Sequence, residues 1–213
     1  MLENNFLTKL LDGQKVEWKS LGEVCEIFGG LTGKTKEDFT NGESQYISYK
    51  NIFNNHEVDF NNLEKVNIKT NEKQHTIKYG DVLFTGSSEI ASEAGISSAV
   101  TKNIDAIYLN SFSFGVRFKN EFFLIPEFSK YLFRSSLMRK QIAQTANGVT
   151  RFNVSKKLFK KIKIPIPCPE NPAKSLEIQQ KIVTILDKFT QLTAELTAEL
   201  TAELRNRKKQ YSY

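Results

Sequence analysis

The spacing of hydrophobic and polar positions divides the chain into three zones, of which the first is short. Residues 3–11 carry apolar side chains at helical spacing, and Asp12-Gly13 follows them as a stop signal. This pattern predicts a short N-terminal helix within residues 1–14. Because an isolated helix of this length is marginal in water, we expect it to pack against another element.

The second zone, residues 15–169, alternates short apolar bursts with turn residues. The bursts are rich in β-branched and aromatic residues, which predicts short strands at 46–49, 81–84, 106–109, 112–118 and 162–166. Pro126 stands at the expected first turn of one or two helices over 127–146, and Ser155 is a good N-cap for a further short helix. Strands and helices mixed in this way predict an α+β domain.

The third zone is one long helix, predicted over residues 173–210. Four prolines between residues 165 and 172 form a stiff boundary, and neither Pro nor Gly occurs from there to residue 209. At about 1.5 Å per residue the helix is roughly 55 Å long. Its apolar side chains fall within an arc of roughly 120°, and a long helix with one such seam needs a partner helix. The seam residues are Ile178, Ile182, Ile185, Phe189, Leu192, Leu196, Leu200 and Leu204.

Inside this helix the unit Thr-Ala-Glu-Leu occurs three times, over residues 193–204. Each unit adds roughly 6 Å of helix and about 40° of rotation, so the leucine seam drifts around the axis. Two interpretations remain open. The repeat is either a low-complexity stretch of surface helix or a spacer whose length matters.

Composition and charge narrow the classes of protein. The chain has 213 residues, 39% of them hydrophobic, and no apolar run approaches the roughly 20 residues of a membrane span. The N-terminus lacks a signal-peptide pattern and the two cysteines, Cys25 and Cys168, have no metal-like spacing, so we expect a cytoplasmic protein without a membrane association. A net charge of +6 suits a polyanionic partner.

No catalytic or metal-binding motif is evident. Residues 29–35 resemble a phosphate-binding loop, but Phe28 stands where the first glycine of that motif belongs. His56 and His75 lack a metal-ligand or catalytic companion nearby in the sequence. We therefore predict no catalytic residues, no metal site and no cofactor bound by this chain.

Polar and aromatic residues suited to nucleic acid interleave in several loops and in a basic segment near residue 156. Lys, Arg, Asn and Ser/Thr side chains hold phosphates or read base edges. For any one of the lysines, a solvated charged surface is the slightly favoured interpretation over a phosphate contact. The candidate DNA-binding residues are Thr32, Lys34, Thr35, Lys36, Tyr49, Lys50, Asn51, Ser87, Ser88, Thr150, Arg151, Asn153, Lys156, Lys157 and Lys160.

The order of these segments resembles a target recognition domain from the specificity (S) subunits of type I restriction–modification systems. The segments that carry the resemblance are, in order, Val16-Glu17-Trp18-Lys19-Ser20-Leu21-Gly22-Glu23-Val24, Tyr46-Ile47 with Asn51-Ile52, Gly80-Asp81-Val82-Leu83-Phe84, Gly148-Val149-Thr150, Ile164-Pro165-Ile166-Pro167, and Glu177-Ile178-Gln179. The Thr-Ala-Glu-Leu repeat is a feature of some S subunits. Two departures stand out: Ile178 separates Glu177 from Gln179, and the chain has one recognition domain and one long helix where the family generally has two.

The resemblance implies a non-catalytic subunit that recognises double-stranded DNA for partner subunits. In the family, modification subunits methylate adenine with S-adenosylmethionine, and restriction subunits use ATP and Mg²⁺. Two copies paired through the long helix, antiparallel by family analogy, are expected to read an interrupted palindrome whose spacing the helix sets. The competing hypothesis is a coiled-coil adaptor without sequence-specific DNA binding, and an autonomous DNA enzyme is a weaker third.

Overall fold

The computed structural model describes residues 11, 13–40, 42–120 and 123–210. The predicted helix at residues 3–11 lies outside this part, apart from residue 11. The described elements, in chain order, are β1 (Val16–Ser20), α2 (Leu21–Val24), β2 (Cys25–Gly29), η1 (Glu37–Phe39), β3 (Ser44–Ile47), α3 (Tyr49–Asn54), β4 (Glu64–Val66), β5 (Val82–Thr85), β6 (Ser87–Ser88), η2 (Ala91–Glu93), β7 (Ser97–Ala99), β8 (Ile107–Leu109), β9 (Ser113–Phe118), α4 (Pro126–Leu132), α5 (Ser136–Ala143), β10 (Ala146–Asn147), β11 (Phe152–Val154), α6 (Lys156–Phe159), β12 (Lys163–Pro167) and α7 (Pro172–Gln210).

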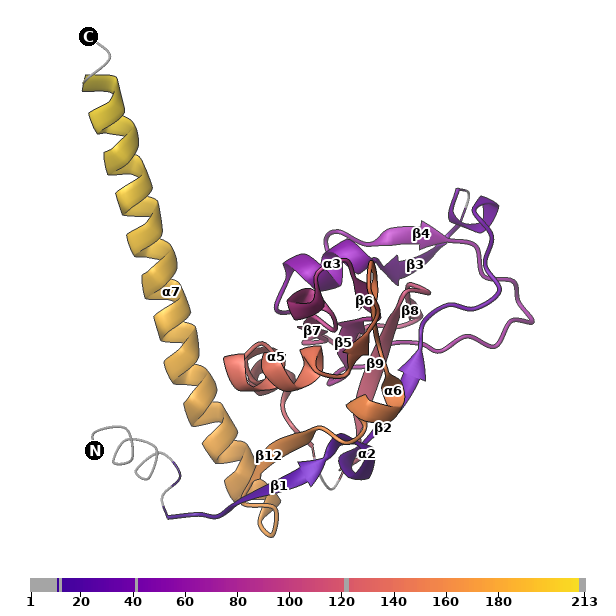
Figure 1. The fold of residues 1–213 in the computed structure, drawn as a ribbon, viewed down its shortest axis with the longest axis horizontal. Helices are drawn as coiled ribbons and strands as arrows, with labels where there is room; N and C mark the ends of the chain where they lie inside the picture. The colour runs from indigo at the N-terminus through magenta and orange to yellow at the C-terminus, as the bar shows by residue number, and fades with distance from the viewer. Residues whose placement is uncertain (1–10, 12, 41, 121–122, 211–213) are drawn as a thin grey trace.

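The strands of the described residues form four small sheets. An antiparallel sheet in the order β2-β9-β5-β7 lies at the centre of the domain, and β4-β3-β8 extends it on one side (Figure 1). A third sheet has the order β10-β11-β6, and β1 pairs with β12 to form the base from which α7 leaves the domain. The predicted α+β class is therefore confirmed, with one globular domain and one long helix.

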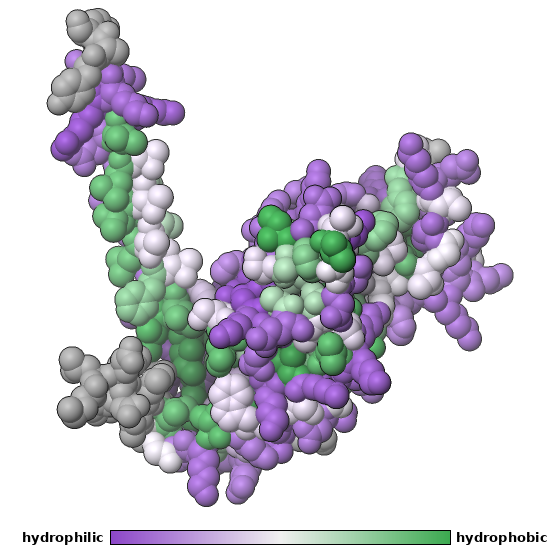
Figure 2. Space-filling view, in the orientation of Figure 1, coloured by the Kyte–Doolittle hydropathy of each residue, from purple (hydrophilic) through white to green (hydrophobic). Residues whose placement is uncertain are grey.

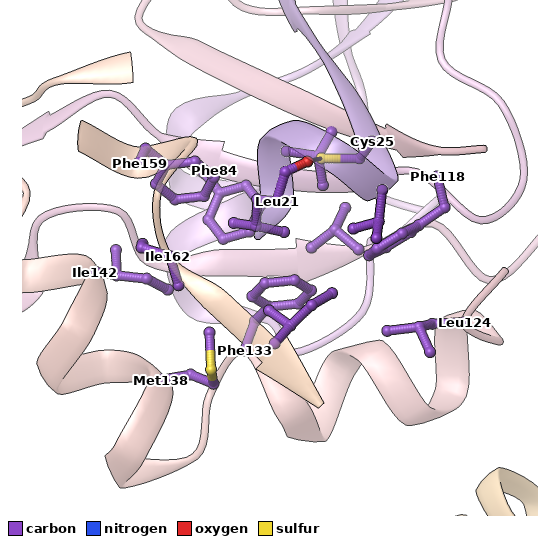
Figure 3. Close-up of a cluster of buried hydrophobic side chains, with 14 of the residues drawn as sticks. Leu21, Cys25, Phe84, Phe118, Leu124, Phe133, Met138, Ile142, Phe159 and Ile162 are labelled. Atoms are coloured by element: carbon purple, nitrogen blue, oxygen red, sulfur yellow. Dashed lines mark hydrogen bonds between the residues drawn. The ribbon is translucent and has the colours of Figure 1, made fainter. Parts of the chain in front are cut away.

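A cluster of aromatic rings forms the core between the central sheet and the helices that cover it (Figure 3). The ring of Phe84 on β5 lies 5.4 Å from Phe114, 5.2 Å from Phe133 and 5.0 Å from Phe159, measured between centroids. Such pairs contribute about 0.5–1.5 kcal/mol each beyond the burial of their area. Phe133 follows α4 and Phe159 lies on α6, while Met138 and Ile142 of α5 belong to the same buried cluster, so all three helices pack on this core.

The segment Gly80-Asp81-Val82-Leu83-Phe84 owes its pattern to this core. Asp81 is fully buried at the start of β5, where its carboxylate accepts from Nε and Nη2 of Arg117 at 2.8 and 2.7 Å. The backbone N–H of Lys78 also donates to Asp81, which closes the turn before the strand. The hydrogen bond from Arg117 to Asp81 raises the pKa of the guanidinium. The role of this motif in the domain is structural.

Helix α7 begins one residue before the predicted start of the long-helix zone at 173 and ends at its predicted end, residue 210. Asn171 caps it by accepting from the N–H of Lys174 at 3.1 Å. Gln179, which is fully buried, accepts from the N–H of Ile125 at 2.9 Å and lies against Ser175 at 3.2 Å. Further along, the Tyr131 hydroxyl donates to Asp187 at 2.5 Å. After that contact α7 rises clear of the domain (Figure 1).

The remaining strand and helix predictions have mixed outcomes. Strands near 81–84, 106–109, 112–118 and 162–166 are present with shifts of one residue, and residues 127–146 form two helices. The predicted strand at 46–49 is wrong in its second half, because Ser48 accepts from the N–H of Asn51 and starts α3. In the short helix predicted after Ser155, which is α6, Phe159 is fully buried and Leu158 is 39% exposed.

Candidate nucleic-acid interface

Strand β6 is the point at which loops distant in the sequence meet. The carbonyl oxygen of Ser87 accepts from the hydroxyl of Tyr49 at 2.7 Å, and its Oγ accepts from Nε of Arg151 at 3.0 Å. The N–H of Gly86 donates to the carbonyl of Phe112 at 2.8 Å. Segments around residues 49, 87, 112 and 151 are thus held together by hydrogen bonds, and we call their exposed surface the β6 face.

A two-stranded ribbon, β10–β11, forms one edge of the β6 face. Asn153 pairs with Ser87 on one side and with Asn147 on the other, and residues 148–151 connect the two strands. Thr150, Arg151 and Asn153 are exposed. Five of the predicted residues therefore lie on or beside one ribbon: Ser87, Ser88, Thr150, Arg151 and Asn153.

Tyr49 separates two shallow depressions on the β6 face. One is lined by Tyr49, Lys50 and Phe112 together with residues of β3. The other lies between Tyr49 and Arg151 and includes two carboxylates, Glu89 and Glu93. Lys50 is exposed at the first depression, whereas Ser87 and Ser88 are buried in the floor of the second. The face combines cationic, aromatic and hydroxyl groups, which can hold phosphates and contact bases.

A half-buried arginine, Arg134, fixes α3 beneath this face. Arg134 donates through Nη2 to the carbonyls of Ile52, Phe53 and Asn55 at the C-terminal end of α3, and through Nε to Ser97. Burial lowers the pKa of this guanidinium to about 10, so it stays charged at neutral pH. A cation against the last carbonyls of a helix is favourable.

The loop that carries Thr32, Lys34, Thr35 and Lys36 is not part of the β6 face. Lys34 points inward: its Nζ forms an ion pair with Glu72 and donates to the carbonyl of Asn67 at 2.6 Å, leaving the side chain 2% exposed. Thr35 donates through its N–H and hydroxyl to Asp38. Lys34 is therefore a structural residue, because an amine already paired and buried cannot reach DNA. Thr32 and Lys36 are exposed.

Asn51 is also corrected from a candidate contact to a folding residue. Its side chain is buried, and its amide donates to the carbonyls of Asp59 and Asn62 at 2.8 and 2.9 Å. Its Oδ1 accepts from the N–H of Asp59 at 3.0 Å. These bonds use the amide group to close the loop after α3, so none of it faces outward.

The three candidate lysines near α6 are exposed but spread around a single helical turn. Lys156 Nζ lies 5.8 Å from the centroid of the Phe114 ring, on the side of α6 next to the central sheet. The carbonyl of Lys160 accepts from the N–H of Gly22 beside α2 at 2.9 Å. Lys157 is exposed between them. They form a basic rim without a shared partner.

The seam of α7 separates into two parts. Ile178 is fully buried in the domain, Ile182 packs against the aromatic core, and Ile185 is half-buried. Ile178 is therefore covered by its own domain and is not available to a dimer seam, whereas Ile182 and Ile185 are only partly covered. The rest of the seam is exposed by 56–63% and forms a hydrophobic band along α7 (Figure 2). We call this band the exposed seam; it consists of Phe189, Leu192, Leu196, Leu200 and Leu204.

The threonines of the repeat lie beside the exposed seam with their hydroxyls already bonded. Thr193, Thr197 and Thr201 each donate to the carbonyl four residues earlier, at 2.7 Å. Since these hydroxyls need no partner outside the helix, the Thr and Ala positions form a face of small residues that another helix can approach.

Sequence reasoning missed Phe112 and Val149. Phe112, placed in a predicted strand, precedes β9 and is 66% exposed; Val149 at the ribbon turn is 91% exposed. The polar pair Asn110-Ser111, which marks a turn, indicates that Phe112 lies next to a turn and not inside a strand. The strands that frame Val149, of two and three residues, are too short to leave a periodic pattern in the sequence.

Among the residues that the structure describes, no group of three or more His, Cys, Asp or Glu side chains is placed to hold a metal ion. No helix in the described part of the chain is both long and apolar enough to cross a membrane.

Comparison with known proteins gives a consistent result. The family model "Type I restriction modification DNA specificity domain" matches residues 14–206. The specificity subunits of the Escherichia coli type I restriction enzymes EcoprrI and EcoR124I/EcoR124II are 35% and 32% identical over this whole chain, which spans 52% and 46% of their lengths.

Solved structures share the fold. An HsdS subunit from Thermoanaerobacter tengcongensis aligns with a TM-score of 0.57 at 18% identity, over 92% of this chain and 45% of that one. The S subunit from M. genitalium aligns at 0.53 and 15%, over 88% and 42%. The chain spans about half the length of the curated relatives it matches. It belongs to the family of type I restriction–modification DNA specificity domains.

Proposed function

We propose that this chain is the DNA-recognition component of a type I restriction–modification complex. The observation that carries the proposal is the β6 face, where Tyr49, Lys50 and Arg151 are presented together by a domain of the specificity family. The chain itself is non-catalytic and binds no cofactor. Modification subunits supply adenine methylation with S-adenosylmethionine, and restriction subunits supply ATP- and Mg²⁺-dependent cleavage.

Two copies of the chain pair through the exposed seam in this proposal. Four leucines and Phe189 exposed on one helix face make a contiguous apolar surface that water disfavours. Antiparallel pairing keeps the basic ends, residues 205–209, apart and brings each toward Asp187 of the other copy. Two domains related by a two-fold axis then read an interrupted palindrome.

The repeat sets the separation of the two half-sites. One Thr-Ala-Glu-Leu unit of helix is roughly 6 Å long, slightly under two base pairs at about 3.4 Å each. The number of repeats therefore acts as a ruler between the two recognition domains.

The test is to express the chain with its modification subunit and to map methylated adenines across a plasmid by single-molecule sequencing. We expect methylation at one interrupted palindrome. An asymmetric bipartite site would show that a different specificity chain supplies the second half and would refute self-pairing. No methylation with both proteins folded would refute DNA recognition and favour the adaptor hypothesis.

Arg151 provides a sharper test at the level of one residue. Arg151→Ala is expected to weaken binding to the methylated sequence by about 1–3 kcal/mol, because an exposed guanidinium oriented by Ser87 is lost. Lys73→Ala removes the same charge from an exposed loop outside the β6 face and serves as the control. Equal weakening in both variants would mean that only net charge matters.

A further inference from the structure

The tip of the β10–β11 ribbon is a close turn that carries an apolar side chain outward. Gly148 has φ +153°, and a Cβ at this position would lie 1.9 Å from the carbonyl oxygen of Arg151. Only glycine, which has no Cβ, therefore allows the backbone to approach itself this closely. Nδ2 of Asn153 donates to that same oxygen at 3.3 Å. Val149, in the turn between Gly148 and Asn153, is 91% exposed. Among the described residues, no other large hydrophobic side chain has a higher exposed fraction.

The surroundings of Val149 distinguish it from an ordinary surface valine. A single exposed apolar residue needs no explanation in itself. Val149, however, stands next to Thr150 and Arg151 at the edge of the β6 face, where Ile90 and Phe112 are also exposed, by 53% and 66%. The tip therefore pairs an outward apolar group with an adjacent cation that is held in place by Ser87.

We propose that Val149 is a specificity-determining residue that contacts the C5-methyl group of a thymine in the major groove. This inference rests on the proposed DNA-recognition function. The major groove of B-DNA admits a two-stranded β-ribbon, and the thymine methyl is the apolar group that base edges present there. With the ribbon tip in the groove, Arg151 reaches a neighbouring phosphate or guanine while Val149 meets the methyl group.

The experiment uses the full chain bound to its modification subunit and a pool of 40-base-pair duplexes of random sequence. Sequencing the bound duplexes gives the preferred site, and each thymine in that site is then replaced by uracil, which lacks only the methyl group. At one thymine in each half-site, uracil is expected to weaken wild-type binding about three- to fivefold, at fixed salt, since burying one such group is worth about 0.8 kcal/mol. Val149→Ala should bind the thymine and uracil duplexes equally.

Leu137→Ala is the matched control, because Leu137 is 54% exposed on α5, outside the β6 face; it should keep the wild-type preference for thymine. Circular dichroism checks that each variant is folded, which we expect because neither side chain is buried. A site without thymine, a wild type indifferent to uracil, or a Val149→Ala variant that still prefers thymine would overturn the inference and leave DNA recognition standing. A pool that yields no preferred site would overturn both.

Discussion

The two halves of α7 share one apolar stripe but have opposite surroundings. Up to Asp187 the helix is part of the domain: Ile178 is fully buried, and Gln179 and Asp187 bond to neighbouring segments. From Phe189 onward the same stripe continues with its side chains 56–63% exposed. A regular seam thus shows that a helix has a covered face, but it does not show whether the cover is its own domain or another chain.

The largest expected effect comes from placing charged residues in the outer half of α7. Leu196→Glu with Leu200→Glu should abolish pairing of two copies, because four leucines leave the interface and each contributes about 1.5–3 kcal/mol when buried. Sedimentation equilibrium measures the change. The paired variant Glu195→Ala with Glu199→Ala, outside the seam, should stay dimeric; dissociation of both variants would argue against leucine-mediated pairing.

Substitutions in the inner half of α7 should change the free energy of unfolding of the domain. Ile178→Ala is expected to lower the free energy of unfolding by about 2–5 kcal/mol, since it leaves a cavity in a packed site. Urea titration followed by Trp18 fluorescence on β1 reports the change. Leu200→Ala, compared at concentrations where the protein is monomeric, should differ by less than about 0.5 kcal/mol. Similar losses in both variants would contradict the division of the helix.

Gln179 tests the polar part of the anchor. Gln179→Ala should cost about 1–3 kcal/mol of unfolding free energy, because the partly buried N–H of Ile125 loses its acceptor. The neighbouring Gln180 is exposed, so Gln180→Ala is the control and should have little effect. If the two variants unfold at the same urea concentration, the buried amide is not an anchor.

The smallest effect is expected at the boundary between the halves. Tyr131→Phe removes the hydroxyl that donates to Asp187, which should cost about 0.5–1 kcal/mol. Hydrogen exchange should then quicken locally around residues 184–190 without a change at Ile178. Faster exchange along the whole helix would place the boundary elsewhere.

Features of the fold that depend on neighbouring residues were predictable from the sequence, whereas contacts between residues distant in the sequence were not. The long helix was predictable because nothing interrupts its propensity, and the strand at Gly80-Asp81 because a turn signal precedes an apolar run. The inward turn of Lys34 was not, since its partner Glu72 is 38 positions away. Asn51 likewise satisfies carbonyls eight and eleven residues later, a contact that no local pattern encodes.

The residue types of the candidate interface were predictable from the sequence, but the way in which the fold brings these residues together was not. Ser87 and Arg151 were selected separately as polar loop residues, and they are joined only because β6 and β11 pair side by side. Strands of two or three residues are too short for a periodic signal, so the ribbon and its tip residue Val149 emerge only from the fold.

The central claim is that the outer half of α7 pairs two recognition domains and sets the distance between their half-sites. Deleting residues 197–200, one repeat unit, and mapping methylated adenines in the presence of the modification subunit tests it most directly. We predict unchanged half-sites with a spacer shortened by about one or two base pairs, and an unchanged spacer for Thr197→Ala, which keeps the length. An unaltered spacer after the deletion would contradict the claim.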